Sequence, residues 1–164
     1  FHMQIKKVLS KKEIESIEDI LEKNYGCKVD LKNFFIFITS DNKLWLANKE
    51  AENIIKELRR CYRIGIYFGK LKRNNKIKLS IEGALIVGKK ANKNIAIVDE
   101  KEAVKFMEGY DVSNFKAINA ELHNFIIVKN GKGDVLGTGI LREGYIENLI
   151  PKARKLRKAE ELME

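Results

Sequence analysis

The sequence predicts an α+β protein of two lobes: an N-terminal α/β lobe over residues 3–91 and a small, mainly β lobe over residues 92–164. Three observations predict this class. Apolar residues recur at helical spacing in the first half of the chain, they alternate with period two in later segments, and a polar, basic connector over residues 88–94 separates the two patterns. With 164 residues, the chain has the size of one domain or two small ones.

The first expected element is a helix that begins after Ser10. Ser10 and Glu13 have the spacing of a capping box. One helical face is apolar, with Ile14, Ile17 and Leu21. Gly26 can supply a left-handed residue, so we expect the helix to end between Asn24 and Gly26.

A hairpin and a second helix are expected next. The segments 34–39 and 43–47 are apolar and flank three turn-forming residues. Asn48 can cap a helix whose apolar positions are Ala51, Ile54, Ile55 and Leu58. We expect Trp45 to pack this helix onto the hairpin, and a base-stacking role is the less favoured alternative.

A second hairpin is expected between Tyr62 and Ser80, with its loop at residues 72–76. Gly65 and Gly69 lie in its first strand and predict bulges or a close approach of backbone. The apolar segment 81–87 that follows is expected to be helical.

The second lobe is expected to contain one helix and several strands. Asp99 and Glu102 predict the start of the helix, and Gly109 predicts its end. The expected strands are 95–98, 115–118, 125–129, 135–141 and a short one at 145–146, with a turn at 130–134. Pro151, the only proline, should end the last strand, and an exposed helix or loose tail should follow.

Catalytic, metal-binding and cofactor-binding patterns are not evident in the sequence. His123 has no credible triad partners, and Gly137 and Gly139 lie within a strand, where they favour tight packing over dinucleotide binding. Cys27 and Cys61 are the only cysteines, too few with the two histidines for a zinc site, and we expect them to be structural. We therefore expect no enzyme activity, no metal and no cofactor.

Basic residues are the strongest functional signal. The 32 Lys and Arg exceed the 23 Asp and Glu, which gives a net charge of +9 and favours a polyanionic partner over a membrane. If the basic groups share a face, they form a groove that tracks phosphates. A solvated surface is the alternative. The candidate phosphate contacts are Lys70, Lys72, Arg73 and Lys76 on the hairpin, Lys89 and Lys90 on the connector, and Lys152, Arg154, Lys155 and Arg157 after the proline.

Residues 94–157 resemble a PUA domain, an RNA-binding pseudo-barrel. The resemblance rests on IAIVDEKEA at 95–103, FMEGYDV at 106–112 and FIIVKNGKGDVLGTG at 125–139. RIGIYFGKL at 63–71 and ENLIPK at 147–152 also resemble the C-terminal region of Sun/Fmu-type rRNA cytosine-5 methyltransferases. The chain lacks their Pro-Cys motif and cofactor domain, so the resemblance implies the RNA-binding part alone. The order of lobes is similar to that of pre-PUA/PUA ribosome-biogenesis factors.

This resemblance implies a fold, a function and further site residues. The fold would be a pre-PUA-like α/β lobe followed by a PUA-like pseudo-barrel, in which Gly109 and Tyr110 lie close to RNA. The function would be non-catalytic binding of structured rRNA or tRNA in ribosome biogenesis or RNA modification, beside an RNA-modifying enzyme or a pre-ribosomal particle. A cytoplasmic location is expected for a separate reason, since the sequence shows no secretory apolar segment and no apolar run long enough to span a bilayer. The alternatives are a protein-interaction adaptor within an RNA-processing complex and, less favoured, a small RNA-modifying or hydrolytic enzyme.

Overall fold

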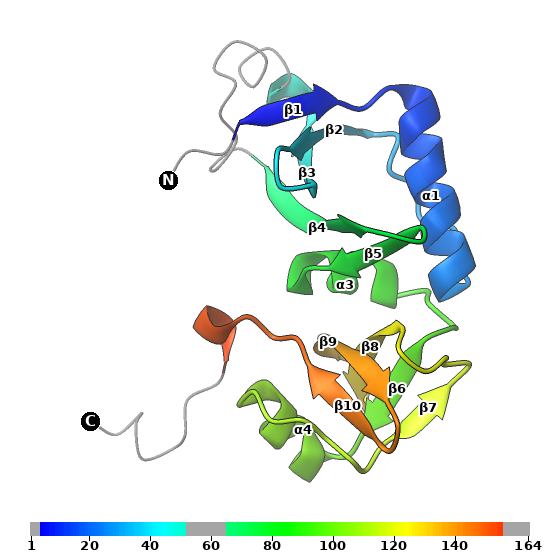
Figure 1. The fold of residues 1–164 in the computed structure, drawn as a ribbon, viewed down its shortest axis with the longest axis vertical. Coiled ribbons are helices and arrows are strands. Elements are labelled where there is room, and N and C mark those ends of the chain that lie inside the picture. The colour runs from blue at the N-terminus through cyan, green and yellow to red at the C-terminus, as the bar shows by residue number, and fades with distance from the viewer. Residues whose placement is uncertain (1–3, 52–64, 156–164) are drawn as a thin grey trace. The chain divides into compact units, whose positions relative to one another are not determined.

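The computed structural model describes residues 4–51 and 65–155. The chain forms two compact units, residues 1–90 and residues 91–164. Each contains a five-stranded sheet with helices packed against it, so the predicted α+β class is confirmed (Figure 1).

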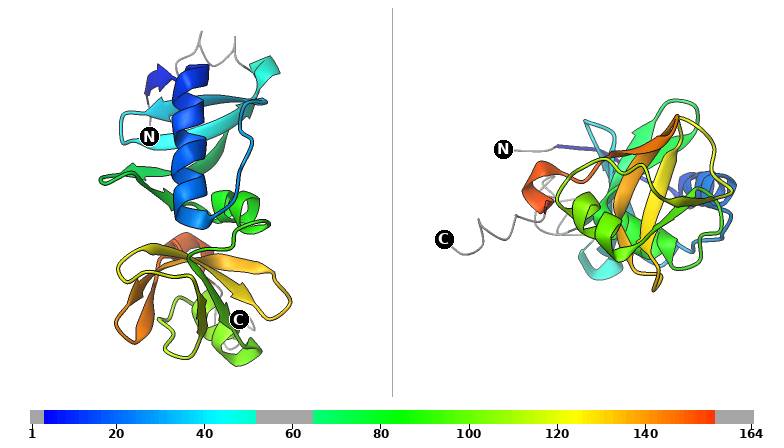
Figure 2. Two further views of the ribbon diagram at one scale, coloured as in Figure 1. Left: turned by 90° about the vertical axis from the view of Figure 1, so that its right-hand side faces the viewer. Right: turned by 90° about the horizontal axis from the view of Figure 1, so that it is seen from below.

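The first unit is an antiparallel sheet of strand order β1-β2-β3-β4-β5. Helix α1 lies across one face of this sheet (Figure 2). In β2 the buried residues are consecutive, from Phe35 to Thr39, so both faces of this strand are covered. The elements are β1 (Ile5–Val8), α1 (Lys11–Tyr25), β2 (Phe34–Thr39), β3 (Lys43–Asn48), a 3₁₀ turn (Lys49–Ala51), β4 (Ile66–Lys72), β5 (Lys76–Leu79) and α3 (Ile81–Gly88).

Helix α1 has the predicted caps. Glu13 N–H donates to Ser10 Oγ at 3.2 Å, and Ser10 N–H donates to Glu13 Oε1 at 3.0 Å, which completes the capping box. Gly26 ends the helix in the left-handed conformation with φ 75°. The sequence patterns missed β1, whose Lys7 forms an ion pair with Glu13 at 2.5 Å and so ties the strand to the helix start.

The Glu13 carboxyl is expected to titrate far below its ordinary range. The side-chain bond from Lys7, followed by the Ser10 N–H, lowers the pKa of Glu13 from 4.5 to about 2. The stabilisation is therefore complete above pH 4.5 and is lost as the pH falls toward 2. An NMR titration of Lys7→Gln should show the Glu13 pKa moving toward 4.5. The matched control Lys6→Gln should leave it near 2, and an equal response to both changes would contradict this assignment.

A β-bulge interrupts the pairing of β3 with β4. Leu44 pairs with Gly69 and Trp45 pairs with Tyr67, so Phe68 is the extra residue. Ser80 stabilises the bulge, because its Oγ donates to the Tyr67 carbonyl at 2.5 Å and its N–H donates to the Phe68 carbonyl at 3.0 Å. The same Oγ caps α3, the helix predicted at 81–87. The sequence predicted bulges or a close approach of backbone at Gly65 and Gly69. The bulge lies immediately before Gly69, and a Cβ at Gly65 would lie 3.1 Å from the Leu46 carbonyl oxygen, which is a close approach.

The second unit is a mixed sheet of order β10-β9-β8-β6-β7, in which only the β6–β8 pair is parallel. Ile126, Ile127 and Val128 in β8 are fully buried, which places this strand at the centre of the core. Helix α4 packs against the sheet and buries Phe106. The elements are β6 (Ile95–Val98), α4 (Glu100–Met107), β7 (Lys116–Ile118), β8 (Phe125–Asn130), β9 (Val135–Arg142), β10 (Tyr145–Asn148) and a 3₁₀ turn (Lys152–Arg154).

Two predicted segments differ from the structure or lie outside it. Asn48 ends β3, and a 3₁₀ turn follows it at Lys49–Ala51. The predicted helix positions Ile54, Ile55 and Leu58 lie outside the described residues. After Pro151 the chain forms the short 3₁₀ turn, and the remainder of the predicted tail, from residue 156, also lies outside them.

Candidate nucleic-acid interface

Strand register gathers lysines on one face of the first sheet. Lys70 pairs with Lys43 on one side and with Lys78 on the other, and Lys72 pairs with Lys76. Directly paired residues share a face of a sheet, as do residues two apart in one strand. We call this surface the lysine face. It consists of Lys43, Lys70, Lys72, Lys76 and Lys78.

The other predicted contacts of the first unit lie at turns. Arg73 is exposed in the turn between β4 and β5, where Asn74 and Asn75 have positive φ angles of 65° and 55°. Asn24 Nδ2 at the end of α1 donates to the Asn75 carbonyl at 3.1 Å and so holds this turn. Lys89 and Lys90 are exposed just after α3.

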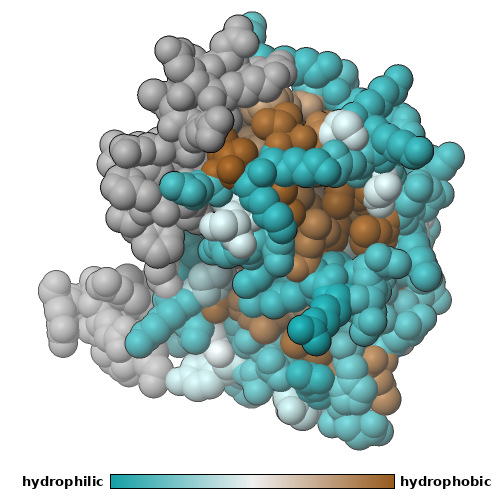
Figure 3. All heavy atoms as spheres, turned by 45° about the horizontal axis from the view of Figure 1, so that its top comes forward, coloured by the Kyte–Doolittle hydropathy of each residue, from teal (hydrophilic) through white to brown (hydrophobic). Residues whose placement is uncertain are grey.

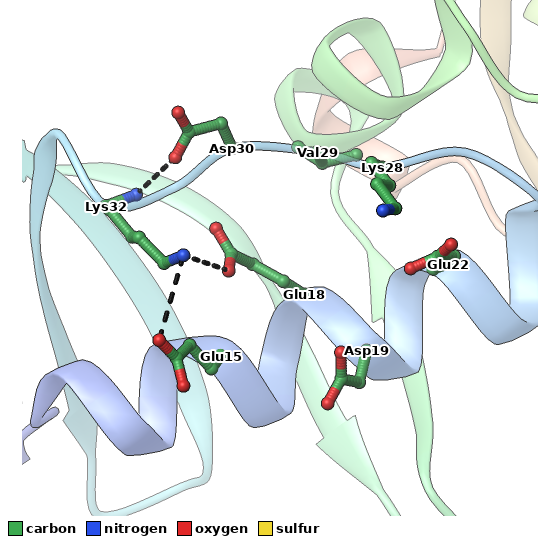
Figure 4. A pocket seen from close by; sticks show the side chains of 8 residues that line it. All are labelled: Glu15, Glu18, Asp19, Glu22, Lys28, Val29, Asp30 and Lys32. Carbon is green, nitrogen blue, oxygen red and sulfur yellow. Dashed lines mark hydrogen bonds and ion pairs between the residues drawn. The ribbon is translucent and has the colours of Figure 1, made fainter.

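The exposed side of α1 has the opposite charge. A hollow of about 430 Å³ is lined mainly by carboxylates (Figure 4). Lys32 reaches into it, with Nζ 3.7 Å from Glu15 Oε1 and 3.8 Å from Glu18 Oε1. Helix α1 covers one face of the sheet and the lysine face is the other, so this group of carboxylates lies apart from the lysine face, with Lys28 and Lys32 among its neighbours. The carboxylates that line the hollow are Glu15, Glu18, Asp19, Glu22 and Asp30.

In the second unit, Asn148 joins the end of β10 to the turn after α4. Its Nδ2 donates to the Phe106 carbonyl at 2.7 Å and to the Tyr110 carbonyl at 2.9 Å. Its Oδ1 accepts from Ile150 N–H at 2.8 Å, and its own N–H donates to Asp111 Oδ1 at 2.8 Å. One side chain therefore fixes the turn that contains Gly109 and the chain that leads into Pro151.

Gly109 and Lys155, both predicted contacts, lie together beside this junction. Gly109 has φ 102°, and a Cβ there would lie 2.5 Å from Lys155 Cδ and 2.6 Å from Lys155 Cε. The Lys155 stem thus lies directly on the Gly109 backbone. Tyr110 beside it is 49% exposed. Lys152 and Arg154 are exposed in the preceding 3₁₀ turn, and Arg157 lies outside the described residues.

Substituting Gly109 by alanine should weaken nucleic-acid binding through Lys155. The new Cβ must displace the flexible Lys155 stem, and the positive φ adds strain of about 1 kcal/mol. We expect affinity for a stem-loop RNA, measured by fluorescence anisotropy, to fall on the order of 3- to 10-fold. Gly133→Ala is the matched control, because Gly133 has φ 87° but open space around it. Equal affinities of the two variants would refute a role for the Lys155 contact.

Residues predicted to be structural have structural contacts. A Cβ at Gly139 would lie 2.5 Å from Ile146 Cγ2, which confirms that strand packing requires glycine there. His123 Nδ1 lies 3.0 Å from Arg142 Nη1, and no further catalytic partner of His123 is found among the described residues. Cys27 is buried, as predicted, and Cys61 lies outside the described residues.

The sequence patterns missed two residues of these surfaces. Lys43 is separated from the basic run by more than twenty residues and joins it through strand pairing alone. Asn148 was named in the sequence only within a segment that resembles another family, and its hydrogen bonds reach residues 37 to 42 positions away.

Hydrophobic residues also reach the surface on the face drawn in Figure 3, with hydrophilic residues around them. In the described part of the chain, no helix has the length and apolar character needed to cross a membrane.

Comparison with known proteins relates both units to PUA domain proteins. Residues 6–81 match the family model of the NIP7/UPF0113 pre-PUA domain. A conserved PUA domain protein from Thermoplasma acidophilum is similar in structure with a TM-score of 0.61 and 14% identity, over 90% of this chain and 95% of that one.

A PUA domain protein from Aeropyrum pernix K1, solved as a tartrate complex, is similar with a TM-score of 0.55 and 11% identity, over 97% of this chain and 95% of that one. No curated protein matches the chain. The resemblance to Sun/Fmu-type methyltransferases stays a prediction. The chain has the fold of PUA domain proteins, and its first unit is similar to a NIP7/UPF0113 pre-PUA domain.

Proposed function

We propose that this protein binds structured rRNA or tRNA without catalysing a reaction and acts in ribosome biogenesis or RNA modification. The observation that carries the proposal is the junction of the second unit. There Lys155 lies on Gly109, beside the exposed Tyr110 and just after the exposed Lys152 and Arg154. The similarity of the first unit to the NIP7 pre-PUA domain supports the biological setting.

The chemistry of this junction suits a folded RNA. Lys and Arg side chains neutralise phosphates and fix the position of the protein on the helix. The Lys155 side chain lies over the turn at Gly109, where its ammonium group can meet a phosphate, and the exposed Tyr110 offers a ring and a hydroxyl. Such contacts recognise the shape of an A-form stem more than its sequence. Such a stem would belong to the RNA of a pre-ribosomal particle or to the RNA substrate of a modifying enzyme.

A charge-reversal experiment tests this function. In Lys152→Glu/Lys155→Glu, anisotropy should show affinity for a stem-loop RNA falling by at least about tenfold at 0.1 M salt. The slope of log affinity against log salt should become shallower by about 1.8, because two phosphate contacts are lost. The matched control Lys11→Glu/Lys12→Glu changes the net charge equally at the start of α1 and should bind normally. If the unmodified protein fails to bind stem-loop RNA at low salt, the proposal is wrong.

The adaptor alternative depends on exposed apolar residues at two places. On α1, Ile14, Ile17 and Leu21 are buried, and in β2 the residues from Phe35 to Ile38 are buried as well. Neither place therefore offers the apolar docking surface that this alternative requires, and RNA binding is the better-supported function.

A further inference from the structure

The lysine face lies beside an aromatic pair. Trp45 is paired with Tyr67 across β3 and β4, with ring centroids 5.4 Å apart. Lys43 connects the two groups, since its Nζ lies 5.3 Å from the centroid of the Tyr67 ring. Trp45 and Tyr67 are both half-buried residues.

The bulge at Phe68 creates this juxtaposition. In a regular strand, Tyr67 and Lys70 would lie on opposite faces, because they are three residues apart. The extra residue brings both to the face that contains Lys43, Lys70 and Lys78 in a row across three strands. Neighbouring strands are about 4.8 Å apart, so this row is on the order of 10 Å long.

Contacts with the neighbouring strand β2 hold Trp45 of the aromatic pair in place. Trp45 stacks on Phe37 at 6.4 Å with an interplanar angle of 3°, and its Nε1 donates to Thr39 Oγ1 at 3.3 Å. Phe37 is fully buried. A ring that is already fixed loses little conformational entropy when a ligand packs against it.

Charge favours an anionic ligand on this face. The hairpin residues 70 to 78 contain five basic side chains and no acid. Asp41 lies nearby, and its carboxylate is engaged by Lys43 at 3.4 Å and by the Thr39 hydroxyl at 2.6 Å. The carboxylates of α1 lie on the other side of the sheet and would repel phosphates there.

We propose that the lysine face, with Trp45 and Tyr67, binds an unpaired segment of RNA: the lysines contact successive phosphates and the rings stack with bases. Aromatic rings interleaved with cations suit single strands, because unpaired bases expose their faces whereas those in a duplex are stacked on each other. This inference rests on the proposed function and adds a second, single-stranded contact to the stem recognised by the other unit.

Trp45 is the only tryptophan, so its fluorescence reports on this face directly. Titrating the full chain with a uridine 12-mer should quench this fluorescence, whereas a blunt RNA duplex should leave it nearly unchanged. Lys70→Glu/Lys78→Glu should weaken 12-mer binding about 20-fold at 0.1 M salt and lower the salt slope by about 1.4. The control Lys11→Glu/Lys12→Glu should retain both the quenching and the affinity.

A second pair of variants tests stacking separately from charge. Tyr67→Leu should lose at least about fivefold in affinity for the 12-mer, whereas Tyr67→Phe keeps the ring and should bind normally. Binding of the 12-mer without quenching, or normal binding by Lys70→Glu/Lys78→Glu, overturns the inference. If stem-loop RNA still binds in that case, the proposed function stands; if neither RNA binds the unmodified protein, both fail.

Discussion

Gly83→Ala should destabilise the first unit by about 3 kcal/mol. A Cβ at Gly83 would overlap the Phe68 carbonyl oxygen and lie 3.2 Å from Leu79 Cδ2. The oxygen belongs to the backbone, so α3 itself must move away from β4. Helix propensity alone favours alanine over glycine by about 1 kcal/mol. Propensity therefore predicts that Gly83→Ala raises the free energy of unfolding, whereas the clash with Phe68 predicts that it lowers it.

Thermal unfolding followed by Trp45 fluorescence measures this change, because Trp45 lies in the first unit. For a unit of this size, the expected shift of the melting temperature is on the order of 15 °C downward. Leu85→Ala is the control within the same helix: Leu85 is 46% exposed, and its loss should matter little. An unchanged or raised melting temperature for Gly83→Ala would show that α3 does not require close contact with the bulge.

The same substitution connects stability with the lysine face. Ser80 and Gly83 hold the bulge at Phe68 from outside the hairpin, and the bulge sets the register that aligns Lys70 with Lys43. When α3 moves, the two carbonyls bonded to Ser80 lose their partner and the register is no longer fixed. Gly83→Ala should therefore also weaken binding of the uridine 12-mer at a temperature where the unit is still folded.

Local patterns predicted the elements that depend on local contacts. The capping box at Ser10 and the hairpin turn at residues 130–134 each depend on residues close in sequence. Strand β1 was missed because Ile5–Val8 has charged residues at its centre and its position is fixed by pairing with β2, some thirty residues later.

The candidate surfaces were predicted only in part, for the same reason. The basic run at 70–78 is visible in the sequence, but the alignment of Lys43 with it depends on strand register. The bulge depends on Ser80 and Gly83, which lie outside the strand that it interrupts. Likewise, the contact of Lys155 with Gly109 joins residues 46 positions apart, and only the fold brings them together.

Asn148→Ala should destabilise the second unit by about 3 kcal/mol. The substitution removes two donors from the Phe106 and Tyr110 carbonyls and one acceptor from Ile150 N–H. The bonds to the Phe106 carbonyl and from Ile150 N–H are partly buried, and each group left there without a partner costs about 1 to 3 kcal/mol, whereas water can replace the exposed bond to the Tyr110 carbonyl. The control Asn130→Ala removes a similar number of bonds at the β8–β9 turn, where all of them are exposed to water, and should cost only about 1 kcal/mol.

The two units allow an internal control for Asn148→Ala. Amide exchange in β8 and β9 should become faster, whereas the Trp45 fluorescence transition of the first unit should keep its midpoint. Stem-loop RNA should bind more weakly even at temperatures where the second unit is folded, because the turn with Gly109 loses its tie to the chain before Pro151. Quenching of Trp45 by the uridine 12-mer should persist, since that contact belongs to the first unit. If Asn148→Ala abolished both the binding of stem-loop RNA and the quenching of Trp45 by the 12-mer, the assignment of separate RNA contacts to the two units would be wrong.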